Sequence, residues 1–389
     1  MPDRFAKIKS FLLLQFTIMA QIGLCDVVKL TLANVAEDQI DGNFFNEGGT
    51  LKALSDPSNT RGQSPSPDKG MGMVSRKTSR TGNPIVEIRN YQRSNASTAT
   101  AFDCTANTAI SPVATEFELT KKRQASVRIP VELMNELCGD AARIYSTAST
   151  LPGGIEANFI PPTRIMEEVR TILINQLFLP LIKDVNADIL TEIAASKIGT
   201  NITTGDALPK PLALFDGNGD LRQQGHTTLF TDFTQNAMNG SPIVVGAERL
   251  LAYVTQLGWG CCNDAGVDFK EMAKRAPIRG YYDYNTDAIL GADELLVFAP
   301  EMLKFASFVQ NKFPMLADGK HGTSSFGYVQ LQELPGIEWD MQIKENDCAT
   351  PSWDIFVRLS YDVWGAGTSI FGAGDRLENV NGVFSYVVS

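Results

Sequence analysis

Residues 163–199 read TRIMEEVRTILINQLFLPLIKDVNADILTEIAASKIG, and their apolar side chains recur at helical spacing for most of the stretch. Steps of mostly three or four place these side chains along one stripe of a helix: Ile165, Val169, Ile172, Leu173, Leu177, Leu181, Val185, Ile189 and Ile193. At a rise of about 1.5 Å per residue, such a helix spans roughly 50 Å. The stripe must be covered by other parts of the chain, and the length indicates an elongated subunit.

The helix is expected to begin at Thr163, because Pro161 and Pro162 cannot extend a helix upstream and Thr is a favoured N-cap. Its end is expected at residues 197–199, where a Lys is followed by a Gly. Pro180 lies inside the stretch and lacks a backbone donor. We therefore expect the helix to kink near Pro180 or to break into two segments.

The chain has 389 residues, 43% of them hydrophobic, which is enough for two or three folded domains. Its net charge of −10 argues against a dedicated nucleic-acid-binding protein, because counterion release needs a clustered basic face. An acidic wall would repel packaged phosphates, so the charge does not exclude a container for nucleic acid.

No pair among the six cysteines shows Cys-x-x-Cys spacing, so a reduced, intracellular setting is the simpler interpretation: Cys25, Cys104, Cys138, Cys261, Cys262 and Cys348. The adjacent pair Cys261 and Cys262 can in principle oxidise, but two such thiols in a Trp-Gly-Cys-Cys run are more often packing residues.

The N-terminus allows three interpretations. Basic residues within positions 1–9 precede an apolar stretch at 11–24, as in a secretory signal, but two glutamines dilute that stretch and no Ala-x-Ala-like cleavage site follows. The rivals are an amphipathic N-terminal arm and a true start at Met19, which would exclude residues 1–18. No other stretch approaches a membrane span of roughly 20 apolar residues, so we expect a soluble mature protein.

The next segments are expected to lack a core. Residues 26–46 are a mixed segment that fits a strand or a draped arm. Residues 47–73 are rich in Gly, Ser, Pro, Asp and Asn, which is linker chemistry, too polar to support a core.

Residues 74–131 are basic and rich in strand-forming residues. Strands are expected around 85–91, 117–119 and 127–131, with a polar run at 94–111 between them. Together they predict one long extended hairpin with too few large apolar residues to stand alone. Its basic side chains are either a solvated face or contacts to the acidic surface of a neighbouring copy. The candidate inter-subunit residues are Arg76, Lys77, Arg80, Arg89, Arg93, Lys121, Lys122 and Arg123.

Beyond the hairpin, residues 131–149 predict a short helix. After Gly199 the pattern predicts a small α/β domain: a strand at 242–246, a helix at 247–257, a strand at 294–299 and a helix at 300–308 that opens with Pro.

The strongest strand signal lies at residues 337–344 and 355–361, where apolar and polar side chains alternate on either side of a turn. Two such runs predict an antiparallel hairpin with one apolar face. We expect that face to pack against the stripe of the long helix.

The order and lengths of these elements resemble the major capsid protein of tailed double-stranded DNA bacteriophages, the Hong Kong 97 type fold. The likeness rests on residues 84–93, 117–131, 163–199, 291–303 and 336–364. It implies an α+β chain divided as follows: an N-terminal arm and linker (1–73), an E-loop hairpin (74–131), a peripheral domain with a spine helix (132–205), an axial domain (206–320), peripheral strands (321–364) and a C-terminal segment (365–389).

The resemblance further implies a virion shell, built from pentamers and hexamers in the host cytoplasm around double-stranded DNA. Portal, scaffold and decoration proteins would be its partners, with no membrane, cofactor, metal or catalytic residue. Two alternatives stay open: an encapsulin-like protein compartment, and a secreted or surface-binding α+β protein.

Motifs for chemistry are weak. His226 and His321 are expected in polar loops without metal-binding spacing, and no nucleophile elbow, phosphate loop or dinucleotide fingerprint occurs. Residues 216–220, DGNGD, begin like a calcium loop, but Leu221 and Thr227 stand where Gly and Glu are required. A turn is the preferred interpretation, and we expect no enzyme.

Overall fold

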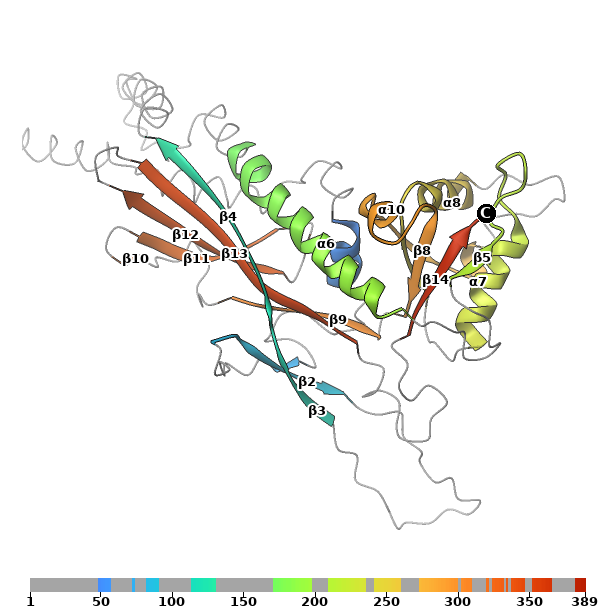
Figure 1. Cartoon of the computed structure of the whole chain (residues 1–389), viewed down its shortest axis with the longest axis horizontal. Coiled ribbons are helices and arrows are strands. Elements are labelled where there is room, and N and C mark those ends of the chain that lie inside the picture. The colour runs from blue at the N-terminus through green and yellow to red at the C-terminus, as the bar shows by residue number, and fades with distance from the viewer. Residues whose placement is uncertain are drawn as a thin grey trace, which may run out of the picture.

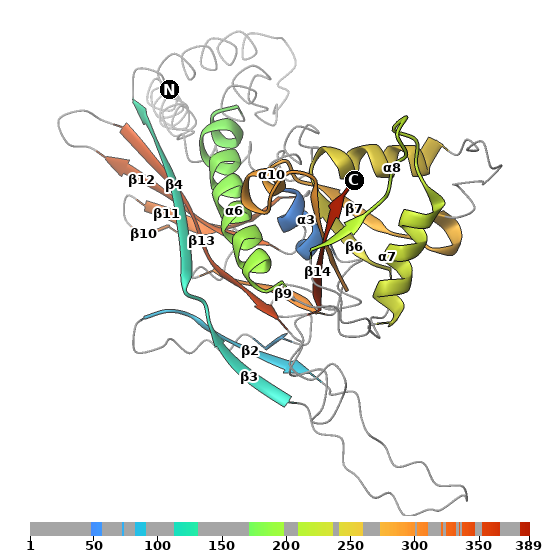
Figure 2. The same cartoon turned by 45° about the vertical axis from the view of Figure 1, so that its right-hand side comes forward.

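The computed structural model describes residues 48–56, 72–73, 82–90, 113–130, 171–197, 209–235, 241–259, 273–299, 302–309, 320–321, 324–331, 334, 337–346, 352–365 and 382–389. The expected N-terminal segments before residue 48, the run at 94–111, the helix at 131–149 and all six cysteines lie outside these residues. The described part is a mixed α+β fold. A long helix lies across a six-stranded sheet, a five-stranded sheet stands beside it, and a three-stranded sheet extends away (Figures 1 and 2).

The long helix is confirmed over its described part. The description starts at Thr171, within the helix, which passes through a π-helical turn, η2 (Leu173–Phe178), and continues as α6 (Leu179–Ala195). The expected start at Thr163 lies outside the described residues. The described members of the predicted stripe from position 173 onward are at most 3% exposed: Leu173, Leu177, Leu181, Val185, Ile189 and Ile193. The helix thus ends two residues before Lys197, close to the expected stop.

The disturbance expected at Pro180 takes the form of the π-helical turn. The N–H of Leu179 donates to the carbonyl oxygen of Ile174, five residues back, which is the bond of a π-helix. This wider turn lies immediately before the proline, which has no N–H of its own to donate. The helix therefore changes geometry at this point but does not divide into two segments.

The six-stranded sheet is antiparallel throughout and follows the order β10-β11-β12-β13-β4, with β9 also paired to β13. Its strands are β4 (Lys121–Pro130), β9 (Leu303–Phe308), β10 (Lys320–His321), β11 (Ser324–Gln330), β12 (Glu338–Asn346) and β13 (Ser352–Gly365). The late hairpin predicted from alternation is the pair β12–β13, in which Ile343 lies opposite Ile355.

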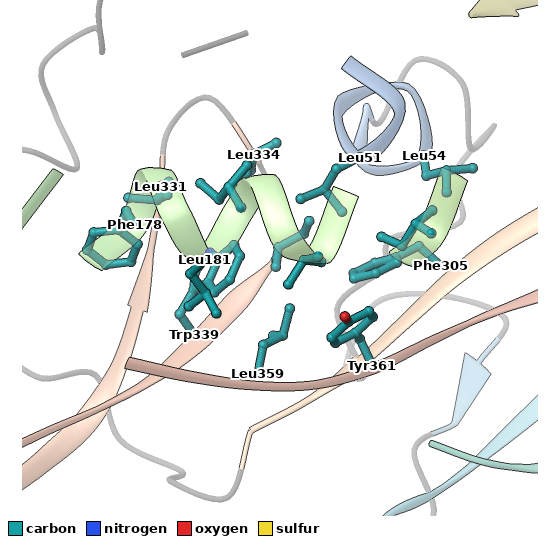
Figure 3. Close-up of a cluster of buried hydrophobic side chains, with 14 of the residues drawn as sticks. Leu51, Leu54, Phe178, Leu181, Phe305, Leu331, Leu334, Trp339, Leu359 and Tyr361 are labelled. Atoms are coloured by element: carbon teal, nitrogen blue, oxygen red, sulfur yellow. The ribbon is translucent and has the colours of Figure 1, made fainter. Parts of the chain in front are cut away.

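The apolar face of this hairpin packs on the long helix, as predicted. Seven of its side chains are at most 1% exposed and belong to the same buried cluster as the helix stripe: Trp339, Met341, Ile343, Ile355, Val357, Leu359 and Tyr361. Phe178 meets Trp339 edge-on at 6.1 Å between ring centres (Figure 3). Fully burying one large apolar side chain contributes about 1.5–3 kcal/mol, so the packing of this face on the helix contributes strongly to the stability of the described body.

The helix predicted at 300–308 is wrong. Residues 303–308 form strand β9, which pairs with β13 over Ser360–Gly365, just beyond the point where β12 ends its pairing at Arg358. Leu303 and Phe305 face the main core, while Ala306 faces the projecting sheet. A short apolar run does not distinguish a helix from a strand by its period. Residues 303–308 form a strand because the part of β13 beyond its pairing with β12 is available to pair with them.

The expected three-stranded hairpin at 74–131 is also corrected. The first two strands, β2 (Ile85–Asn90) and β3 (Val113–Glu118), pair with each other, and β2 also pairs with β1 (Gly72–Met73). The third, β4, leaves this sheet and pairs with β13 from Lys121 to Pro130. Its alternating residues include Ile129, which is 1% exposed in the main core, and burial there outweighs pairing in the hairpin.

The five-stranded sheet follows the order β5-β14-β8-β6-β7. Its strands are β5 (Lys210–Leu212), β6 (Ile243–Gly246), β7 (Arg279–Tyr282), β8 (Glu294–Phe298) and β14 (Val383–Val388), with helices α7 (Gln223–Gln235), α8 (Glu248–Trp259) and α10 (Asn285–Ile289). The predicted elements at 242–246, 247–257 and 294–299 are confirmed as β6, α8 and β8. The C-terminal strand β14, which lies inside this sheet, was not predicted.

Alternate residues of the five-stranded sheet serve two cores. Val244 and Val297 pack in the cluster that includes residues of α7 and α8, whereas Val245 and Phe298 belong to the cluster that contains the long helix. The main buried cluster therefore runs from the six-stranded sheet, across the helix, into the five-stranded sheet. The described body is one packed unit.

The linker expected at 47–73 is wrong for its first residues. Helix α3 (Gly49–Ser55) lies within it, and Leu51, Ala53 and Leu54 are at most 5% exposed in the main core. Polar composition averaged over the whole segment concealed one apolar turn. No helix in the described ranges is long and apolar enough to cross a membrane.

Candidate functional site

Neither histidine lies in the polar loop that the sequence predicted for it. His226 was expected in a polar loop, but it lies in α7, is 1% exposed, and is hydrogen-bonded through Nδ1 to the hydroxyl of Tyr253 on α8. Burial lowers the pKa of His226 and raises the pKa of Tyr253, which favours the neutral form of both groups. His321, also expected in a loop, is in the short strand β10.

Residues 216–220 form the turn that the sequence favoured. Asp216 Oδ1 accepts the N–H groups of Asn218 at 2.8 Å and Asp220 at 2.9 Å, and Gly219 has φ of +87°. These two backbone bonds, from Asp220 first, lower the pKa of Asp216. Among the described residues, no group of three or more His, Cys, Asp or Glu side chains is placed to hold a metal ion.

The candidate functional feature is the projecting hairpin of β2 and β3. Its strands pair over six residues, from Ile85 opposite Glu118 to Asn90 opposite Val113, and it extends away from the body (Figures 1 and 2). The buried cluster at this sheet holds Val86, Leu119 and Ala306, with Phe117 and Phe308 packed against it, and two of those five side chains come from β9 of the body. Among the residues whose burial is described, the buried side chains at the base of the hairpin are thus shared with the body.

The base of the hairpin is firmly held. Leu119 is fully buried, and its N–H donates to the carbonyl oxygen of Pro84 at 2.9 Å. The N–H and the hydroxyl of Thr120 both donate to Asp362 Oδ2, at 3.2 and 2.8 Å. Because Asp362 is a 4% exposed residue of β13, these bonds fix the exit of the hairpin to the centre of the main sheet.

Beyond Thr120, two cations of β4 reach the long helix. Lys121 Nζ is ion-paired with Glu192 and donates to the carbonyl oxygen of Asp188 at 3.3 Å. Arg123 donates twice to the Asp188 carboxylate, each bond at 2.7 Å, and the hydroxyl of Tyr361 donates to the same carboxylate at 2.6 Å. We call this set the base cluster: Thr120, Lys121, Arg123, Asp188, Glu192, Tyr361 and Asp362.

The base cluster perturbs its own acids in opposite directions. Hydrogen bonding to Arg123 lowers the pKa of Asp188, so this carboxylate stays charged. Burial raises the pKa of Glu192, and the nearby Asp362 adds to the effect, although Lys121 opposes it. The cluster therefore joins the hairpin base, the long helix and β13 through charge-assisted bonds that are only partly screened by solvent.

The predicted inter-subunit cations divide into three groups. Arg76, Lys77, Arg80 and Arg93 lie outside the described residues, and for Arg89 only the backbone in β2 is described. Lys122 is exposed on the face of β4 opposite the helix. Lys121 and Arg123 have partners within their own chain.

Sequence reasoning missed the acidic half of the base cluster. Asp188 and Glu192 are one helical turn apart on the long helix, and Lys121 and Arg123 alternate along a strand, so both spacings were visible. Their pairing depended on β4 joining the main sheet, which the sequence did not indicate.

Comparison by sequence found no matching family model and no matching curated protein. Solved structures of phage capsids are similar to this chain over most of its length. The cyanophage A-1(L) capsid covers 90% of this chain and 95% of its own, at 12% identity and a TM-score of 0.42. The capsid of cyanophage P-SCSP1u covers 80% and 85%, at 9% identity and a TM-score of 0.35.

The mature capsid of bacteriophage PhiM1 covers 80% of this chain and 84% of its own, at 11% identity and a TM-score of 0.29. At these values the similarity by itself assigns no function to the chain.

Proposed function

We propose that this chain is a major capsid protein of the Hong Kong 97 type fold, which self-assembles into the icosahedral head of a tailed double-stranded DNA bacteriophage. The observation that carries the proposal is the β2–β3 hairpin, which projects from a firmly held base and shares its described buried side chains with β9 of the body. Beyond that base, a neighbouring copy can cover an extension of this kind.

Each described part has a role in this proposal. The long helix is the spine helix, and the six-stranded sheet beneath it belongs to the peripheral domain. The five-stranded sheet with α7 and α8 is the axial domain, and the β2–β3 hairpin is the E-loop. Because one buried cluster joins both sheets to the helix, the subunit acts as a stiff plate.

Assembly would then be a physical process without a chemical step. The axial parts meet around the axis of each ring of five or six subunits, and the hairpin reaches over an adjacent plate. The base cluster holds the hairpin at a defined angle to the plate, which reduces the conformational entropy lost when a neighbour captures it.

Charge would set the orientation of that contact. The cations proposed for it are Arg76, Lys77, Arg80, Arg89, Arg93 and Lys122, facing the acidic surface of a neighbour in a chain of net charge −10. Lys121 and Arg123 are left out of this set because they stabilise the base of the hairpin within one chain. Portal, scaffold and decoration proteins remain proposed partners, with assembly in the host cytoplasm.

The test is negative-stain electron microscopy of the purified full-length chain, combined with the nucleic-acid content of any particles. Head-sized shells are expected when the chain is expressed alone or with its phage partners, and DNA is expected in particles from infected cells. Closed shells that enclose protein and never DNA would favour the encapsulin-like compartment. A subunit that stays monomeric at high concentration, with the hairpin protected from proteases, would overturn the proposal.

A further inference from the structure

Helix α3 is packed more like a bound peptide than like a part of the continuous chain. Six of its seven residues are buried, and Lys52 is the exception. It contacts α6, β7, β6 and β9, which belong to three different parts of the body. Leu51 and Leu54 of α3 point into the main core and join the cluster that contains the apolar stripe of α6 (Figure 3).

Side chains of the body complete the first turn of α3. Asp283, which is fully buried between β7 and α10, accepts from Thr50 twice through Oδ2: from the N–H at 3.2 Å and from the hydroxyl at 2.6 Å. Asn186 of α6 accepts the N–H of Leu51 at 2.9 Å and donates to the same Asp283 oxygen at 2.7 Å. At the other end of α3, the hydroxyl of Tyr281 donates to Asp56 at 2.6 Å.

Helix α3 has few means of forming by itself. Its N-cap is Gly48, which has no side chain to cap the first turn, and seven residues are too few for a stable isolated helix. Residues 57–71, which follow it, read PSNTRGQSPSPDKGM and are too polar to bury a core. The position and the helical form of residues 48–56 therefore depend on contacts with the body.

We propose that α6, β7 and α10 form a docking pocket for residues 48–56, with Asp283 and Asn186 as its polar recognition groups, and that this segment binds there as a separable unit. Docking attaches everything N-terminal to Gly48 to the body at one defined point. If the chain forms a shell as proposed above, this point is where the N-terminal arm leaves the plate, but the docking itself does not require a shell.

Hydrogen–deuterium exchange on the purified full-length chain tests this proposal. In Gly49→Ala, the added Cβ would overlap the backbone carbonyl of Tyr282. The amides of residues 50–56 should then exchange as in an unprotected peptide, while those of β8 and β14 keep wild-type protection. Gly258→Ala is the matched control, because nothing lies within 4 Å of a Cβ added there.

A milder variant, Thr50→Val, removes the hydroxyl donor and keeps the shape. It should raise exchange in residues 50–56 by about tenfold, the effect of one lost bond to a buried carboxylate. The control is Thr191→Val. The Thr191 hydroxyl donates to the carbonyl oxygen of Ala187 on an exposed helix face, so its loss should leave exchange in residues 50–56 unchanged. Wild-type protection of residues 50–56 in both Gly49→Ala and Thr50→Val would overturn the proposal. Loss of protection in β8 and β14 together with residues 50–56 would overturn it too, because α3 would then be part of one cooperative core.

Discussion

Asp188 is the residue on which the base cluster converges. It receives two bonds from Arg123 and one from Tyr361, so that β4, β13 and the long helix meet at a single carboxylate. The opposite face of the same sheet holds a similar pair, in which Arg128 donates twice to Asp354. The two pairs differ in setting, since the side chain of Arg128 is 65% exposed and that of Arg123 is 42% exposed.

Replacing Asp188 with Asn should lower the free energy of unfolding by about 1 kcal/mol, because Arg123 and Tyr361 both lose a charged acceptor in a partly buried site. The matched variant Asp354→Asn should cost clearly less, because water and salt screen its exposed partner. Urea unfolding of both variants at neutral pH measures the difference. Equal losses would mean that the base cluster contributes no more than a surface ion pair.

We expect His226 to make the packing of α7 on α8 sensitive to acid. Burial lowers its pKa, so the unfolded chain, with an imidazole pKa of about 6.5, binds the proton more readily than the folded chain. The stability that depends on the neutral ring is therefore present above about pH 6.5 and is lost as the pH falls towards the lower folded pKa.

The variant His226→Gln should show a smaller decrease of Tm than the wild type between about pH 7 and about pH 5. Other acids titrate in both proteins, so the comparison isolates the imidazole. Calorimetry at several pH values gives the two slopes. Parallel slopes would show that His226 titrates alike in the folded and unfolded states.

At the scale of elements, the contact between the long helix and the six-stranded sheet determines the stability of the body. Ile189 of α6 is fully buried in the main core, and Thr191, two residues later, is exposed. The variant Ile189→Ala should lose about 2–4 kcal/mol in free energy of unfolding, because it removes apolar contacts and leaves a cavity.

Thr191→Ala is the control on the same helix, with an expected change within about 0.5 kcal/mol. Chemical denaturation of both variants provides the measurement. A loss below about 1 kcal/mol for Ile189→Ala would indicate that the helix packs loosely on the sheet.

At the scale of the whole molecule, the proposed function predicts that charge on the hairpin side governs assembly and leaves folding intact. Reversing Arg76, Lys77 and Arg80 to Glu should give a subunit with a wild-type Tm that forms few or no shells, because the contact to an acidic neighbour becomes repulsive. The charge-preserving variant Arg76→Lys, Lys77→Arg and Arg80→Lys should assemble normally. Light scattering and electron microscopy report both outcomes, and normal shells from the reversed variant would refute the role of charge.

Much of the body could be predicted from local pattern. The apolar stripe at positions 173–193 and the alternation at 337–344 and 355–361 are each repeated over many residues. The helical period is then clear in the first stretch and the strand period in the other two. The predictions of both elements and of their packing against each other were correct. The change of helix geometry at Pro180 could likewise be predicted locally, because a missing backbone donor affects its own turn of the helix.

What the sequence alone determined about this protein is therefore its long helix, its late hairpin, and the small elements β6, α8 and β8. Tertiary structure alone decided that residues 303–308 extend beside β13, that β4 leaves the hairpin for the main sheet, that β14 enters the five-stranded sheet, and that α3 docks on Asp283. The physical reason is the same in each case. These segments are short, their local preferences are weak, and the free energy that places them comes from burial against partners far away in the chain.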